Sequence, residues 1–216
     1  ARVFSGADGS TLWNVTRASS PSTWHPVYFG WAVAGIGDQN GDGFDDFAVG
    51  SPLYSGVWMF SGADPAVLAL YSAAYLGSGG GSGSCDLGYS LAPLSDLTGD
   101  GRLELAVGAP LDLIGSNNTG SVVVLSGIVE PEWVYEGETV LGAIWGAGDI
   151  DGDGCDDLAY SKGSPGPTLV ILSGRNRSVL PTLPANVGRL RRAGDVNADG
   201  LEDLLAEGYI QGSQGI

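Results

Sequence analysis

The chain alternates short apolar runs with polar, glycine-rich connections. The apolar runs, such as residues 121–127 and 168–174, are short, and no segment keeps a 3.6-residue apolar period over three helical turns. Glycine is over-represented, at 37 of 216 residues, and its clusters separate the apolar runs. The pattern therefore predicts an all-β protein in which many short strands are joined by tight turns.

One plan repeats four times along the chain. In each copy a glycine opens a short alternating strand, an acidic loop follows, and a second apolar strand leaves the loop. The four segments are residues 29–52, 87–110, 141–163 and 187–208. The first aspartates of the four loops are Asp38, Asp96, Asp149 and Asp195. They stand about 50 residues apart, a period typical of propeller blades with four short strands each.

Two further strands follow each of the first three repeats. The resulting blades are approximately residues 29–72, 87–137 and 141–183. The fourth repeat, at 187–208, lacks its outer strands, and residues 2–16 closely match the outer strands at 58–72. We therefore expect one β-propeller domain over residues 1–216, with about four four-stranded blades and with the N-terminal strands completing the last.

Two sources of those completing strands are open. The strands belong either to the same chain, which closes a ring, or to a neighbouring subunit, which builds a head-to-tail polymer. Closed propellers are the commoner use of such complementary ends, so the sequence favours closure within one chain.

The acidic loop of every repeat fits the pattern D-x-(D/N/T)-x-D-G-x-x-(D/E). Side chains at positions 1, 3 and 5 direct oxygens toward one ion, and glycine at position 6 permits a sharp turn. The carbonyl at position 7 and the acid at position 9 add further oxygens. Such a flexible, all-oxygen site favours calcium over magnesium or a softer metal, so the sequence predicts up to four Ca²⁺ ions. The alternative is a set of solvated acidic turns that hold no ion.

The candidate ligands occupy the same five positions in each loop. In the first two loops they are Asp38, Asn40, Asp42, Phe44 and Asp46, then Asp96, Thr98, Asp100, Arg102 and Glu104. In the last two they are Asp149, Asp151, Asp153, Cys155 and Asp157, then Asp195, Asn197, Asp199, Leu201 and Asp203. The second loop is the weakest match, because Thr98 and Glu104 replace stronger ligands. An EF-hand is excluded, since Val49 and Tyr160 stand where its position-12 acid is required.

The repeats resemble FG-GAP repeats, the blade unit of the integrin alpha-chain propeller. The motifs that carry the resemblance are Phe29-Gly30, Gly50-Ser51-Pro52 and Gly108-Ala109-Pro110. The resemblance implies a propeller with calcium loops on one face, used for adhesion or recognition and not for catalysis. The chain departs from that family in blade number, since integrin-type propellers have seven blades, and in the loss of Gly-Ala-Pro from the last two repeats.

Charge and composition narrow the function. The formal charge of −16, from 25 acids and 9 bases, disfavours nucleic acid as a partner. No stretch reaches the roughly 18 apolar residues of a membrane span. The single histidine, His25, gives no basis for a hydrolytic triad. A chain that starts at Ala1 without an apolar leader is expected to be a processed, secreted or cell-surface product.

The sequence leads to two functional hypotheses. The first is a secreted calcium-binding adhesion or recognition module, which binds a protein or glycan ligand and is not an enzyme. The second is a structural subunit of an extracellular filament assembled by strand complementation between subunits. Asn14, Asn117 and Asn176 begin possible glycosylation sequons. Cys85 and Cys155 are placed on opposite faces by the repeat, so no disulfide within the chain is expected.

Overall fold

The computed structural model describes most of the chain. The described residues are 1–16, 28–72, 85–111, 113–114, 117–118, 120–128, 130–136, 140–162, 168–180 and 187–208. Within them the chain is all-β, and the one helix is the short 3-10 turn η1 (Pro52–Tyr54). His25 lies outside the described residues.

The first two repeats each form a four-stranded antiparallel sheet. The first sheet contains β3 (Val33–Gly37), β4 (Asp46–Ser51), β5 (Gly56–Phe60) and β6 (Val67–Ser72), in that order. The second contains β7 (Ser90–Pro93), β8 (Glu104–Ala109), β11 (Ser121–Ser126) and β12 (Glu130–Glu136). A small hairpin, β9 (Leu113–Ile114) with β10 (Asn117–Asn118), lies between β8 and β11 in the chain. We call these sheets blades one and two.

The third repeat forms a three-stranded sheet, and two shorter sheets contain the ends of the described chain. Blade three contains β13 (Val140–Gly148), β14 (Asp157–Lys162) and β15 (Thr168–Leu172), and Leu172 also bridges to Val179. The C-terminal half-blade contains β16 (Val187–Gly194) and β17 (Asp203–Gly208). The N-terminal half-blade contains β1 (Arg2–Phe4) and β2 (Thr11–Asn14).

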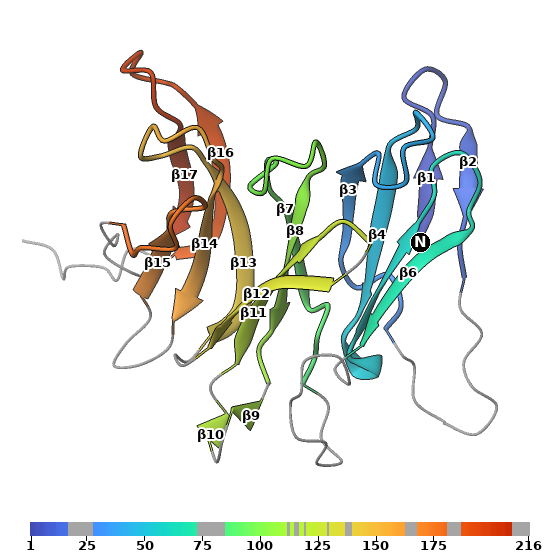
Figure 1. Ribbon diagram of the computed structural model, residues 1–216, viewed down its shortest axis with the longest axis horizontal. Coiled ribbons are helices and arrows are strands. Elements are labelled where there is room, and N and C mark those ends of the chain that lie inside the picture. The colour runs from blue at the N-terminus through green and yellow to red at the C-terminus, as the bar shows by residue number, and fades with distance from the viewer. Residues whose placement is uncertain are drawn as a thin grey trace, which may run out of the picture.

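The sheets stand side by side as successive blades, so the fold is that of a β-propeller (Figure 1). The first strands of the blades are neighbours: β3 contacts β7, β7 contacts β13, and β13 contacts β16. Because side chains alternate along each strand, every inner blade buries both of its faces against its neighbours. This alternation places the core between sheets.

Buried clusters fill the gaps between consecutive sheets. Met59 and Tyr71 of blade one pack with Val107 and Leu125 of blade two. Val124 of blade two shares a cluster with Leu158 and Tyr160 of blade three, and Ile171 of blade three shares one with Leu190 of the C-terminal half-blade. Val15, just after β2, packs with Val49 and Trp58 of blade one. The core is therefore a series of layers.

The two half-blades do not pair with each other in the part of the chain that the structure describes. They form separate two-stranded sheets, which lie at opposite ends of the row of blades (Figure 1). The N-terminal half-blade is fastened to blade one, where the Trp13 indole Nε1 donates to the Gly62 carbonyl at 3.0 Å. The structure thus does not show the ring closed by the chain's own N-terminal strands.

Candidate metal-binding loops

Each acidic loop joins the first strand of its sheet to the second, so the four loops lie along one side of the row of blades, at the same end of the strands (Figure 1). The first aspartate organises each loop. Asp38 accepts hydrogen bonds from the backbone N–H groups of Gly41 at 2.7 Å and Gly43 at 2.8 Å. Asp96 and Asp149 accept the equivalent bonds in the next two loops. The loop is therefore wound around the first carboxylate by local contacts alone.

These backbone donors also set the charge of the first aspartates. The Gly43 N–H holds the pKa of Asp38 below its usual value, and the Gly101 N–H does the same for Asp96. Both side chains therefore keep their negative charge to lower pH than a free aspartate does.

The winding requires left-handed backbone at position 4 of each loop. Gly41, Gly99 and Gly152 supply it with φ values of 79°, 81° and 78°. In the fourth loop Ala198 holds φ at 62° in the same place, where a Cβ is unfavourable. The fourth loop thus keeps the common conformation at a cost in strain.

In the first three loops the acid at position 9 is buried, and in the first and third it ties the loop to the segment after the third strand. Asp46 accepts from the Gln39 N–H at 2.8 Å and from the Gly62 N–H at 3.0 Å. Asp157 accepts in the same way from Ile150 at 2.8 Å and Gly174 at 3.0 Å. Burial raises the pKa of Asp157 to about 6. A bound cation would offset this cost of burying negative charge.

A serine-glycine pair after the third strand completes these loops, and sequence reasoning did not assign it a role. The Ser61 hydroxyl donates to Asp42 at 3.2 Å, and the Ser173 hydroxyl donates to Asp153 at 3.1 Å. The glycines that follow, Gly62 and Gly174, are the donors to the buried acids. The signal was present, because the dipeptide recurs at 5–6, 61–62, 126–127 and 173–174.

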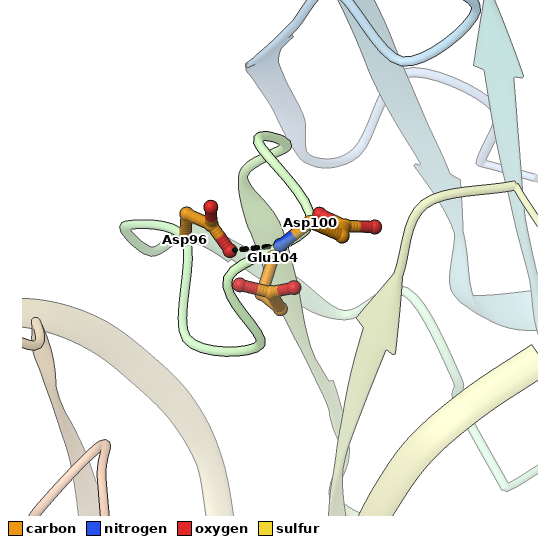
Figure 2. Close-up of side chains that lie close together, drawn as sticks. All are labelled: Asp96, Asp100 and Glu104. Atoms are coloured by element: carbon orange, nitrogen blue, oxygen red, sulfur yellow. Dashed lines mark hydrogen bonds between the residues drawn. The ribbon is translucent and has the colours of Figure 1, made fainter.

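Carboxylate oxygens converge in the second and third loops. Figure 2 shows the side chains of Asp96, Asp100 and Glu104 close together in the second loop, where the Asp100 backbone N–H also donates to Asp96. One oxygen from each lies within 4.8 Å of the others, and the same holds for Asp149, Asp151 and Asp153. These sets contain predicted ligands at positions 1, 5 and 9 of the second loop, and at positions 1, 3 and 5 of the third.

In the first and fourth loops an asparagine amide takes position 3. Its Nδ2 donates to the position-5 aspartate, at 2.9 Å from Asn40 to Asp42 and at 3.0 Å from Asn197 to Asp199. Positions 3 and 5 are therefore adjacent there as well. In the second loop the hydroxyl of Thr98, at position 3, instead donates to Glu104 at 3.1 Å.

The residue at position 7 is held through its backbone. The N–H groups of Phe44, Arg102, Cys155 and Leu201 each donate to the position-5 aspartate at 2.9 Å. The carbonyl oxygens of these residues remain predicted ligands.

Neighbouring loops are bonded to each other. The buried Gln39 amide donates to the Leu103 carbonyl of the second loop at 3.0 Å. The Asp156 N–H of the third loop donates to the Ser95 hydroxyl at 2.7 Å, and the Glu202 N–H of the fourth donates to the Asp149 carbonyl at 3.2 Å. The loops therefore form one connected row.

The remaining sequence predictions concern modification and location. Asn14 and Asn176 are exposed, whereas the side chain of Asn117 lies outside the described part of the structure. Cys85 and Cys155 are both buried, and neither forms a disulfide within the described residues. The described residues also include no helix that is long and apolar enough to cross a bilayer.

Comparison with known proteins identifies a repeat that contains one of these loops. Residues 87–125, which contain the second loop, match the model of the FG-GAP repeat family. The chain carries an FG-GAP repeat. Integrin alpha-IIb of Homo sapiens is 28% identical over 97% of this chain, and Integrin alpha-PS2 of Drosophila melanogaster is 28% identical over 68%. Integrin alpha-M of Mus musculus is 41% identical over 47% of it.

The chain therefore resembles integrin alpha chains along most of its length. The aligned regions cover only 23%, 12% and 9% of the three integrins, so the chain spans less than a quarter of each. The likeness supports the β-propeller fold and the repeat assignment.

Proposed function

We propose that the chain is a secreted, non-enzymatic calcium-binding β-propeller that recognises a protein or glycan ligand. The observation that carries the proposal is the convergence of three carboxylates, with oxygens within 4.8 Å of one another, in the second and third loops. The donor set consists of carboxylate, amide and hydroxyl oxygens, which fits a hard cation of flexible coordination such as Ca²⁺. Integrin-like FG-GAP repeats support the recognition role.

The loop residues would hold the ion between them. The aspartates at positions 1 and 5, the side chain at position 3 and the acid at position 9 supply the oxygens in each loop. A bound calcium ion would supply the positive charge that neutralises these carboxylates. With a formal charge of −16 on the chain, removal of repulsion within the loops stabilises the folded blades.

The ligand face is proposed at the opposite end of the strands from the acidic loops. Trp31 stands just before β3, whereas the loop follows this strand. The Trp31 ring lies 5.6 Å from the rings of both Tyr28 and Tyr89, and all three side chains are exposed. They line a recess of about 150 Å³ with Leu53 and Asp86. Exposed Trp and Tyr side chains supply apolar area with a polar edge, as ligand-binding surfaces require.

Calcium titration tests the metal part of the proposal. We expect isothermal calorimetry to detect binding in the wild type, and Asp151→Asn to weaken one site because it removes a charge from the third loop. Asp64→Asn is the matched control, since Asp64 is exposed in a turn outside the loops. A wild type with no heat of binding, and with the same melting temperature in calcium and in chelator, would contradict the proposal.

A binding screen against extracellular proteins and glycans tests the recognition part. Trp31→Ala should abolish binding of any ligand found without changing the melting temperature, because the side chain is exposed. Val179→Ala provides a control that removes an equally exposed apolar side chain elsewhere. Equal loss in both variants would show that the aromatic cluster is not the contact.

The second candidate function, a structural subunit of an extracellular filament, is favoured by one observation. The two half-blades are incomplete sheets at opposite ends of the row (Figure 1).

A further inference from the structure

The two half-blades carry complementary halves of one blade. In blade one, β4 pairs with β5 and Phe47 stands opposite Phe60. The C-terminal half-blade has the counterparts of β3 and β4, and β17 is the edge strand of its sheet. The N-terminal half-blade has the counterparts of β5 and β6, and begins its sheet at β1. Aligned on blade one, Leu204 of β17 stands opposite Phe4 of β1.

The fourth acidic loop lacks the contacts that Ser5 and Gly6 are suited to make. Asp203 accepts from the Val196 N–H at 2.8 Å, as the other position-9 aspartates do from position 2. Among the described residues, however, no N–H reaches its second oxygen, which in blade one receives the Gly62 N–H. Ser5-Gly6 is the counterpart of Ser61-Gly62, and the Ser5 hydroxyl accepts the Ala7 N–H at 3.2 Å, as Ser61 accepts that of Ala63.

No contact within the N-terminal half-blade explains why residue 6 is a glycine. A Cβ on Gly62 would lie 1.9 Å from the Asp45 carbonyl oxygen, and one on Gly174 would lie 2.1 Å from that of Asp156. Those close approaches require glycine. A Cβ on Gly6 would meet no described atom within 4 Å. Its counterpart contact would be the carbonyl of Glu202 in the fourth loop.

Exposed apolar side chains on the half-blades fit the same docking. Phe4 is 56% exposed, whereas its counterpart Phe60 is 7% exposed and stacks on Phe47 at 5.4 Å. A hollow of about 510 Å³ lies beside Leu204, the counterpart of Phe47, and is also lined by Ile171 and Leu180. With β1 added to β17, the Phe4 ring would enter this hollow.

The first strand of blade one, β3, is uncovered on the face that points away from blade two. Val33 in β3 is 62% exposed, whereas Ile144 and Leu190, at the same position of β13 and β16, are 3% and 0% exposed. Those two side chains are covered by the preceding blade. At the other end Leu205 of β17 is 65% exposed, although its counterpart Ala48 is fully buried. A C-terminal half-blade placed before blade one would cover both Val33 and Leu205.

We propose that the N-terminal half-blade of one copy completes the blade begun by the C-terminal half-blade of a second copy. In the joined blade the Ser5 hydroxyl donates to Asp199, and the Gly6 N–H donates to Asp203. The partner is a second copy because, within one chain, the halves lie at opposite ends and each is packed on its own neighbour, β1–β2 on blade one and β16–β17 on blade three.

The contact is head-to-tail, so it either closes a ring of a few copies or continues as a filament. Two copies would remain within the roughly four to eight blades of known propellers. The inference rests on the second candidate function, the filament subunit, and is independent of the proposed ligand-binding role.

Light scattering of the full chain in millimolar calcium tests the inference. The wild type should form dimers or larger assemblies, and Gly6→Ala should associate at least ~10-fold more weakly, because its methyl group meets the Glu202 carbonyl. Ser10→Ala is the control, since the Ser10 hydroxyl bonds only to Asp8 of its own turn. A wild type that stays monomeric at all concentrations overturns the inference, whether or not its ring is closed.

A mixing experiment separates docking from misfolding. Gly6→Ala disables the N-terminal end of the chain, and Leu205→Glu disables the C-terminal end by placing a charge in the contact. Each variant should be monomeric alone, and the two variants should have the same melting temperature. An equal mixture should form dimers, because the N-terminal end of Leu205→Glu and the C-terminal end of Gly6→Ala are both intact. If the wild type assembles but the mixture stays monomeric, assembly uses another surface and the inference is wrong.

Discussion

Blade one and the C-terminal half-blade contain the same acidic loop in two different settings. In both, the position-9 aspartate accepts the N–H of the residue at position 2, at 2.8 Å. Asp46 is nonetheless buried and accepts a second N–H from Gly62, whereas Asp203 is partly exposed. The loop's winding is therefore a local property, and its attachment to the blade depends on a strand that comes later in the chain.

The largest expected effect is on the position-9 aspartates. Asp46→Ala leaves the N–H groups of Gln39 and Gly62 without their acceptor in a buried place, at a cost of about 3 kcal/mol or more. Asp203→Ala leaves one donor, the Val196 N–H, without its acceptor but exposed to water, and should cost about 1 kcal/mol or less. Urea unfolding in chelator measures both. Equal losses would show that burial at Asp46 does not set the difference.

Removal of calcium should affect the first and the fourth acidic loops unequally. Saturation at about 100 times the dissociation constant stabilises a site by ~2.7 kcal/mol. In the monomer the fourth loop has no serine-glycine attachment. In dilute solution, chelation should therefore lower the free energy of opening that protects its amides from hydrogen exchange by about this full amount. The amides of residues 38–46 should change less, because Ser61 and Gly62 still hold the first loop. If chelation increased hydrogen exchange more in the first loop than in the fourth, the serine-glycine attachment would not be what holds the loop.

The two matched serines offer a smaller test. Ser61→Ala removes the hydroxyl that donates to Asp42 and should cost about 1 kcal/mol. Ser5→Ala should leave the stability of the isolated monomer nearly unchanged, because the Ser5 hydroxyl bonds only within its own exposed turn, to the Ala7 N–H and to the Asp8 carboxylate, among the described residues. Thermal melts of both variants in a dilute solution check this. A large loss for Ser5→Ala would mean that its hydroxyl already makes a bond beyond its own turn within the monomer.

Backbone strain in the fourth loop gives an expected change of similar size to that of Ser61→Ala. Ala198→Gly removes the Cβ at a φ of 62° and should stabilise the chain by ~1 kcal/mol. The reciprocal change in the first loop, Gly41→Ala, should destabilise by a similar amount, since the added Cβ has open space and only the φ of 79° opposes it. Two changes of the same sign would exclude strain as the cause.

The sequence predicted those parts of the structure that depend on local pattern. Alternation and glycine spacing located β3 and β4 within 29–52, and the loop motif located the acidic loop that begins at Asp38. The attachment of Asp46 to Gly62 was not predicted, because strand pairing rather than a local motif brings them together. The source of the strands that complete the last blade stayed open for the same reason: pairing between distant segments depends on the curvature of the whole row. The ligand assignments themselves remain predictions.

The bonds that join neighbouring loops have a thermodynamic consequence. Gln39 lies between two candidate ligands of the first loop and holds the Leu103 carbonyl, which adjoins Glu104 of the second. An ion that fixes one loop therefore also orders part of the next, so the second ion pays less conformational entropy. By linkage the effect is reciprocal. We expect the calcium titration to be cooperative, steeper than that of independent sites, and to become less steep in Gln39→Ala.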